Sequence, residues 1–147
     1  MIIKSLQHKY KNPYCHHIVT IHHQQDPIPE FSGNLFLSGI QGLHKNVVGD
    51  CGISAVLTVM DQWTYGHDEV DKKIQESNLL GYHKWIDLED DTDSSILKHI
   101  EDALDWVEKQ LQTKNVLIHC HMGISRSASL VLAFLMKNFG MTLDQAF

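Results

Sequence analysis

Apolar runs alternate along the chain with longer segments whose apolar residues recur at helical spacing. The short runs have the length and bounded character of buried strands: residues 34–38, 53–60, 79–86 and 116–118. The longer segments are predicted helices: residues 39–50, 67–78, 94–112 and 127–139. This order predicts an α/β fold in which a central, mainly parallel sheet is flanked by helices on both faces.

Local signals refine the predicted helices. Gly49 or Gly52 closes the first, and Ser94 and Ser95 offer N-caps for the third. The third helix turns one apolar stripe inward: Ile96, Ile100, Leu104, Val107 and Leu111. The last helix has almost no polar interruption between Leu130 and Met136, so we expect it to be buried on nearly all sides.

The N-terminal part lacks the regular apolar pattern of the rest of the chain. Residues 1–25 are polar and irregular, and residues 18–21 form either a short strand or a segment laid across the core. One interpretation of its histidines is a transition-metal site, but no cysteine or carboxylate stands at a convincing ligand spacing. A solvated, histidine-rich arm is therefore favoured. The four histidines are His16, His17, His22 and His23. We therefore divide the chain into an arm (1–30) and one domain (31–147), with no metal and no cofactor expected.

Composition narrows the class of protein. At 147 residues the chain can bury a single core, and its net charge of −6 argues against nucleic acid as a partner. No apolar stretch is long enough to span a bilayer, so no membrane partner is expected. Three cysteines cannot all pair, which favours a reducing compartment: the cytoplasm is expected, and the nucleus as a further location.

The turn between the apolar run 116–118 and the helix 127–139 carries the candidate chemistry. Cys120 and Arg126 are separated by five residues, and a loop of that length can curl its backbone amides around an oxyanion. Gly123 permits the positive φ that such a curl needs, and Arg126 can offer a two-pronged donor. The same positive field favours the thiolate of Cys120, a nucleophile facing an electrophilic phosphorus.

The residues His119-Cys120-x-x-Gly123-x-x-Arg126-Ser127 resemble the signature of the protein tyrosine phosphatase superfamily, and HCHMGISRSAS looks like its dual-specificity branch. The resemblance covers most of the chain, residues 34–147. It implies Cys120 as nucleophile and Arg126 with the loop as phosphate clamp, the loop being His121, Met122, Gly123, Ile124 and Ser125. It also implies that Ser127 bonds the sulfur, although helix capping would equally account for it, and that His119 organises the loop.

The resemblance also implies a general acid in the acidic run that precedes the third helix. The family pattern of apolar-x-apolar-x-Asp fits residues 86–90, which points to Asp90, with Asp91 as the alternative after a one-residue slip. Upstream, Trp63 and Tyr65 either rim the substrate or pack against neighbouring loops.

The expected function is hydrolysis of phosphotyrosine and phosphoserine or phosphothreonine in proteins. The alternatives are a phosphate-binding pseudophosphatase or scaffold and, ranked last, a sulfurtransferase. Residues 142–145 have the form of a capping box, yet the sequence ends at Phe147, where family members continue into further helices. We therefore expect a C-terminally shortened domain that exposes apolar surface through which copies could associate.

Overall fold

The structure, a computed structural model, describes residues 2–5, 15–21, 31–60, 66–87, 93–121 and 125–140. Its described strands form one sheet in the order β1-β2-β3-β6-β4-β5. Their bounds are β1 (Ile2–Ser5), β2 (His16–Ile21), β3 (Leu35–Ser38), β4 (Ile53–Val59), β5 (His83–Ile86) and β6 (Asn115–His119). Strands β3, β6, β4 and β5 run parallel, which confirms the predicted sheet.

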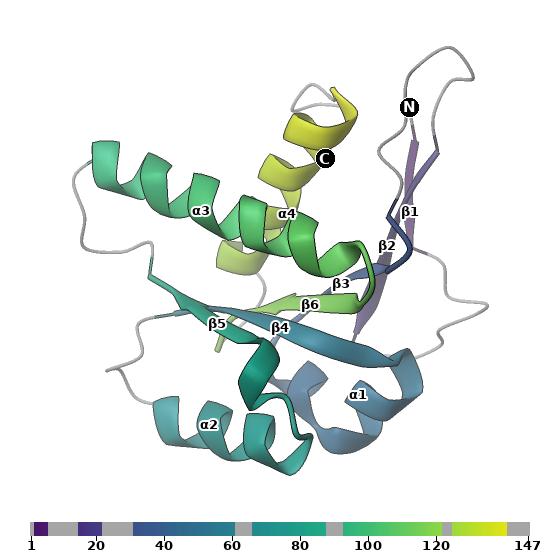
Figure 1. Cartoon of the computed structure of the whole chain (residues 1–147), viewed down its shortest axis with the longest axis vertical. Helices are drawn as coiled ribbons and strands as arrows, with labels where there is room; N and C mark the ends of the chain where they lie inside the picture. The colour runs from purple at the N-terminus through teal and green to yellow at the C-terminus, as the bar shows by residue number, and fades with distance from the viewer. Residues whose placement is uncertain are drawn as a thin grey trace.

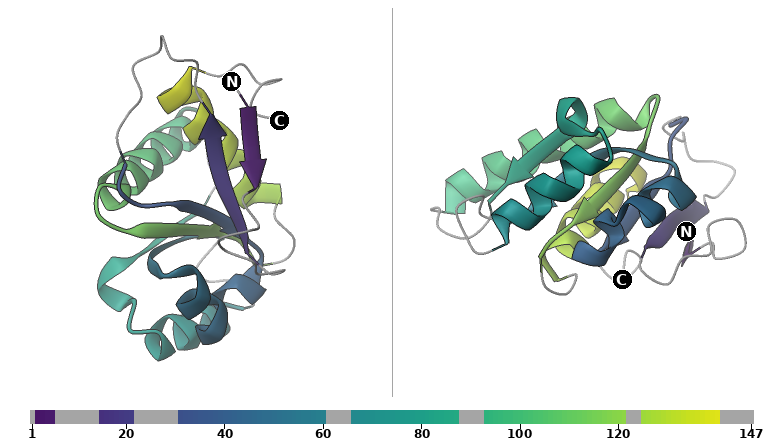
Figure 2. Two further views of the ribbon diagram at one scale, coloured as in Figure 1. Left: turned by 90° about the vertical axis from the view of Figure 1, so that its right-hand side faces the viewer. Right: turned by 90° about the horizontal axis from the view of Figure 1, so that it is seen from below.

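The N-terminal part contributes two strands to this sheet. Strand β2 pairs antiparallel with β3, and β1 pairs antiparallel with β2. Figure 2 shows both strands turned steeply away from the parallel strands. The strand alternative for residues 18–21 is thus confirmed, whereas the strand at Ile2–Ser5 was not predicted.

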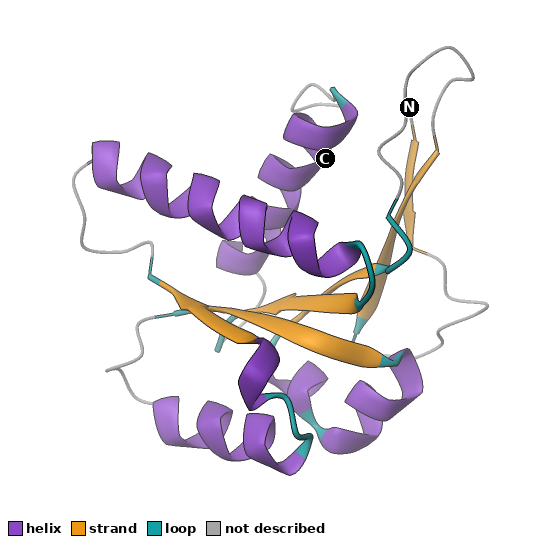
Figure 3. Cartoon of the chain, in the orientation of Figure 1, coloured by secondary structure: helices purple, strands orange, loops and turns teal. Residues whose placement is uncertain are grey.

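Helices cover both faces of the sheet, as Figures 1 and 3 show. On one face lie α3 (Asp93–Leu111) and α4 (Ser125–Phe139), and on the other lie α1 (Lys45–Cys51) and α2 (His67–Glu76). Two short 3-10 helices, η1 (Ile40–Leu43) and η2 (Leu80–Tyr82), precede α1 and β5. Within the described part of the chain, none of the helices combines the length and the apolar character that a membrane crossing requires.

The sheet separates two hydrophobic cores. One core joins its α3–α4 face to the inward stripe of α3, where Leu104, Val107 and Leu111 are buried as predicted and Ile100 is half-buried. The other joins the opposite face to α1 and α2, and it includes Val70 of α2. Alternation along a strand supplies both cores at once, since the neighbours Leu117 and Ile118 of β6 fall into different cores.

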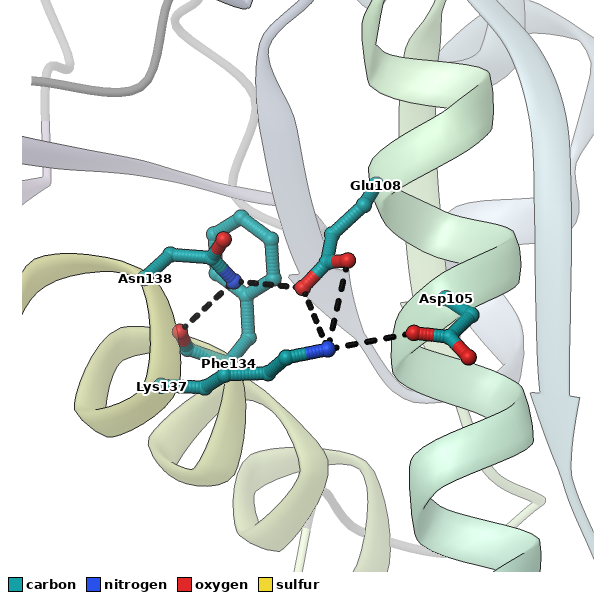
Figure 4. A network of polar contacts seen from close by, with 5 residues as sticks. All are labelled: Asp105, Glu108, Phe134, Lys137 and Asn138. Carbon is teal, nitrogen blue, oxygen red and sulfur yellow. Dashed lines mark hydrogen bonds and ion pairs between the residues drawn. The ribbon is translucent and has the colours of Figure 1, made fainter.

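A polar contact holds the exposed sides of α3 and α4 together (Figure 4). The Lys137 ammonium lies 3.1 Å from an Asp105 carboxylate oxygen and 3.0 Å from one of Glu108, and Asn138 donates to Glu108 at 2.9 Å. Both carboxylates raise the pKa of Lys137. Such exposed pairs contribute little stability, so the buried faces of the two helices carry most of their packing energy.

Several predicted boundaries are wrong for local reasons. The helix expected over 39–50 is interrupted at His44, whose extended backbone separates η1 from α1 and whose ring accepts from the Asn46 amide as an N-cap. The strand expected over 79–86 begins only at His83, after η2. Helix α3 begins at Asp93, which places Ser94 and Ser95 inside its first turn rather than at its N-cap.

Helix α4 is buried along one stripe rather than on nearly all sides. Leu130, Val131 and Phe134 are buried, whereas Met136 is 41% exposed and Arg126 is also exposed. An apolar sequence therefore does not by itself place every face of this helix against the core. The capping box expected at 142–145 lies outside the described residues.

Candidate active site

The β6–α4 junction lies at the carboxyl edge of the parallel sheet. Strand β6 sits between β3 and β4, so its last residues are flanked by neighbours on both sides. In open parallel sheets this edge is where ligands bind. Cys120 follows β6 directly, and its side chain is only 3% exposed.

The Cys120 sulfur faces the first turn of α4. The Ser127 hydroxyl lies 3.4 Å from it, within hydrogen-bond distance for sulfur, and Ser127 is fully buried. Arg126 is the second residue of α4 and is exposed. No acidic residue stands in the first turn of α4, so the partial positive charge of this helix end is not neutralised from within the helix.

A chain of hydrogen bonds leads inward from Cys120. His119 is fully buried; its Nδ1 lies 3.2 Å from the Cys120 carbonyl oxygen and its Nε2 lies 2.7 Å from the Thr58 hydroxyl. A carbonyl oxygen only accepts, so Nδ1 donates. The pKa of His119 is lowered to about 3, chiefly by burial; the hydrogen bond to the Cys120 carbonyl raises it, and the nearby His83 and His121 lower it. The ring is therefore neutral near pH 7.

The same hydroxyl reaches a second histidine. The Thr58 Oγ1 lies 2.7 Å from Nε2 of His83, a half-buried residue at the start of β5. Burial lowers the pKa of His83 to about 4, although the Asp71 carboxylate acts in the opposite direction. Beyond it, Trp85 packs against the His83 ring at a centroid distance of 5.1 Å and stacks on His67 at 5.0 Å.

His121, the first residue after the cysteine, touches the beginning of α2. Its Nε2 lies 3.7 Å from a Glu69 carboxylate oxygen. Gly66, which precedes α2 with φ of 102°, leaves the space that the His121 ring occupies, because a Cβ there would lie 2.5 Å from ring atoms. The residue after Cys120 is thus held against α2.

The structure brings part of the predicted site together. Cys120, Ser127 and His119 are in contact or bonded through the backbone, and Arg126 lies in the first turn of the adjoining helix. Of the other predicted residues, His121 lies against the start of α2, and Ser125 is described only as the first residue of α4. The rest lie outside the described residues: Asp90, Asp91, Met122, Gly123 and Ile124, together with Trp63 and Tyr65.

Sequence reasoning missed Thr58, His83 and Gly66. Thr58 is a polar residue inside the apolar run of β4, and a buried hydroxyl in such a run needs a partner, which was a usable signal. Nothing in the sequence marked His83 as its partner. Among the described residues, no group of three histidine, cysteine or acidic side chains could hold a metal ion.

Comparison with known proteins identifies the family to which the chain is similar. The dual specificity phosphatase catalytic domain matches residues 35–147. Dual specificity protein phosphatase 1 of Arabidopsis thaliana is 28% identical over 127 residues, which cover 84% of this chain and 59% of that protein. Dual specificity protein phosphatase MPK-4 of Drosophila melanogaster is 38% identical over 122 residues, 82% of this chain and 30% of that protein.

Solved structures share the fold. The Cydia pomonella PTP-2 phosphatase superimposes with a TM-score of 0.60 at 24% identity, covering 77% of this chain and 71% of that one. Human DUSP28 superimposes with a TM-score of 0.56 at 21% identity, covering 76% of this chain and 70% of that one. At these identities the similarity concerns the fold alone.

Fold and site together define an α/β protein of the protein tyrosine phosphatase type, in which a cysteine links the central strand to a helix N-terminus. Within that class, the chain belongs to the dual specificity phosphatase catalytic domain family. It spans about three-fifths of the length of the Arabidopsis relative.

Proposed function

We propose that the protein hydrolyses phosphate monoesters of tyrosine, serine and threonine in phosphoproteins through a cysteinyl-phosphate intermediate. The observation that carries the proposal is the junction of β6 and α4, where the Cys120 sulfur lies 3.4 Å from the Ser127 hydroxyl at a helix end free of acidic residues. Family membership supports the reaction class.

In the first step the Cys120 thiolate attacks phosphorus and the bond from phosphorus to the ester oxygen breaks. The backbone amides of residues 121–126 and the Arg126 guanidinium hold the three peripheral oxygens, whose charge is balanced by the positive end of α4. The departing alkoxide takes a proton from Asp90, with Asp91 as the alternative donor. A cysteinyl phosphate and a free alcohol result.

The position of β5 supports an acid from this segment. Ile86 pairs with Val59 of β4, while Thr58 pairs with His119 of β6, so the end of β5 is level with Cys120 at the same edge of the sheet. Two strand spacings separate them, roughly 10 Å. The segment that follows β5 therefore starts close enough to reach a phosphate bound above Cys120.

In the second step a water molecule attacks phosphorus and the bond from phosphorus to sulfur breaks. The carboxylate of the same acid accepts the water's proton, and inorganic phosphate leaves. Ser127 stabilises the departing thiolate by donating its hydroxyl proton to the sulfur, which the 3.4 Å separation allows.

The proposed substrates are phosphoproteins rather than inositol lipids. The loop 121–125 contains no lysine or arginine, and the Glu69 carboxylate lies 3.7 Å from its first side chain, which disfavours a polyanionic headgroup. The resemblance includes no phosphotyrosine-recognition segment, which favours a shallow pocket open to all three phosphorylated residues. We place the reaction in a reducing compartment, the cytoplasm or nucleus, where Cys120 stays a thiol.

The first test is hydrolysis of p-nitrophenyl phosphate by the chain in EDTA, with Cys120→Ser as the matched control. We expect activity that survives chelation and disappears in Cys120→Ser, and a phosphoenzyme that is trapped on acid quenching of the wild type alone. Activity that persists in Cys120→Ser contradicts the covalent mechanism. A folded but inactive wild type that still binds vanadate would favour the phosphate-binding pseudophosphatase instead.

A further inference from the structure

Hydrogen bonds connect the Cys120 carbonyl to His119, His119 to Thr58, and Thr58 to His83. In each of these bonds one of two groups must be the donor. Thr58 carries one hydroxyl proton but contacts Nε2 of both His119 and His83 at 2.7 Å. It can therefore donate to one histidine only and must accept from the other. Two opposite arrangements of the chain exist, and they differ in what they do at Cys120.

In the first arrangement His83 donates from Nε2 to Thr58, Thr58 donates to Nε2 of His119, and His119 donates from Nδ1 to the Cys120 carbonyl. In the second, Thr58 donates to His83 and accepts from His119. The neutral His119 ring then presents a lone pair from Nδ1 to the carbonyl oxygen of Cys120, 3.2 Å away, and the contact becomes repulsive.

The Cys120 carbonyl matters because it belongs to the peptide unit that also contains the amide of His121. In a planar trans peptide the carbonyl and the amide point in opposite directions. Holding the carbonyl toward the buried His119 ring therefore turns the His121 amide away from that ring. The His121 side chain also lies against Glu69 and Gly66 at the start of α2.

We propose that His83 is a positioning residue for the phosphatase reaction, which donates to Thr58 and thereby fixes His119 as the donor that orients the peptide after Cys120. This inference rests on the proposed function. His83 does not touch the reacting atoms and acts through two intervening groups. Its half-buried place on β5 lets a substitution there be accommodated more easily than at the fully buried Thr58 or His119.

The test compares two substitutions of nearly equal shape at position 83. Gln in His83→Gln can donate to Thr58 from its amide, whereas the carboxylate in His83→Glu only accepts and draws the Thr58 proton away from His119. We expect kcat/KM for p-nitrophenyl phosphate in His83→Gln to stay within about threefold of the wild type, and that of His83→Glu to fall by about tenfold or more.

The same two substitutions at position 83, made in a Thr58→Val background, show whether an effect on activity comes from the direction of the hydrogen bonds or from the charge of the glutamate. Valine has no hydroxyl to redirect, so His83→Gln and His83→Glu should then agree within about twofold. A difference that persists without the hydroxyl assigns the effect to the carboxylate charge and overturns the inference. Equal activity of the two variants with Thr58 present also overturns it. Thermal unfolding of every variant identifies loss of fold, and His99→Gln, on the exposed side of α3, controls for removal of a histidine.

A second measurement does not depend on turnover. The rate of Cys120 alkylation by iodoacetamide near pH 7, followed by peptide mass spectrometry, reports the thiolate and its surroundings. We expect the rate to fall severalfold in His83→Glu but not in His83→Gln. If the wild type hydrolyses nothing, the proposed function fails while this comparison still decides the role of His83; if the wild type is active and both variants alkylate alike, the inference alone fails.

Discussion

At the scale of single residues, the buried imidazoles make stability depend on pH. Burial lowers the pKa of His119 to about 3 and that of His83 to about 4, against about 6.5 in the unfolded chain. Below about pH 6.5 the unfolded chain binds protons that the folded chain refuses, so the free energy of unfolding falls as pH decreases. Above that pH neither ring contributes to the pH dependence.

We therefore predict that His119 alone lowers the free energy of unfolding by about 2 kcal/mol between about pH 8 and about pH 5, because pH 5 lies about 1.5 units below its unfolded pKa. His83 acts in the same direction. Urea unfolding at the two pH values measures the loss, and His83→Gln should show a smaller one. A free energy that rises toward pH 5 would contradict the prediction.

The general acid is also a question of a single residue. We expect Asp90→Ala to slow hydrolysis of an alkyl phosphate by about 10²-fold or more while an aryl phosphate with a good leaving group is slowed far less, because only the poor leaving group needs protonation. Asp91→Ala serves as the matched control. If Asp91→Ala shows this pattern instead, the acid lies one residue further along.

At the scale of elements, the start of α2 supports the loop after Cys120. Gly66 has φ of 102°, and a Cβ there would lie 2.5 Å from Cδ2 and Nε2 of His121. We predict that Gly66→Ala costs about 1–3 kcal/mol of stability and also lowers kcat/KM at temperatures where the protein stays folded, because the His121 ring must move.

Gly81→Ala is the control for Gly66→Ala. Gly81 is exposed in η2 and has nothing within 4 Å of its Cβ position, so its substitution should change stability by no more than about 0.5 kcal/mol. Denaturant unfolding and steady-state kinetics on both variants give the comparison. Equal kcat/KM values for the two alanine variants would contradict the prediction that α2 supports the loop after Cys120.

At the scale of the whole molecule, residues distant in sequence are bonded to one another at the edge of the sheet where the parallel strands begin. The Asn115 side chain accepts from the Asn34 amide at 2.8 Å and donates to the Cys51 carbonyl at 2.9 Å, linking β6 to the start of β3 and the end of α1. Gly33 donates to the Leu111 carbonyl at 2.9 Å and lies directly against the Lys114 carbonyl. The chain has no room there for a side chain.

Gly33→Ala should therefore lower the free energy of unfolding by about 1–3 kcal/mol, because a backbone carbonyl must shift to admit the methyl group. Gly49→Ala is the matched control: Gly49 lies in α1 with open space around its Cβ position, and alanine there should stabilise by about 0.5–1 kcal/mol. Denaturant unfolding measures both, and a neutral Gly33→Ala would contradict the packing argument.

The sequence by itself determined the succession of strands and helices along the chain and the placement of Cys120 between β6 and α4. These features depend on residues close together in the sequence. The period of the apolar residues decides whether a segment forms a strand or a helix, and Cys120 to Ser127 span a single loop and the first turn of the helix that follows it. The sequence also predicted the inward stripe of α3 correctly wherever its side chains are described.

Only the tertiary structure decided which distant groups meet. Thr58 reaches His119 across 61 positions of sequence and His83 across 25, because parallel pairing places β4 between β6 and β5. Gly66, at the start of α2, likewise faces His121 from a distant part of the sequence. Burial depends on the same assembly: α4 is apolar enough to be covered all round, yet the described structure covers only one of its stripes. Periodicity identifies the faces of an element, and packing decides what each face touches.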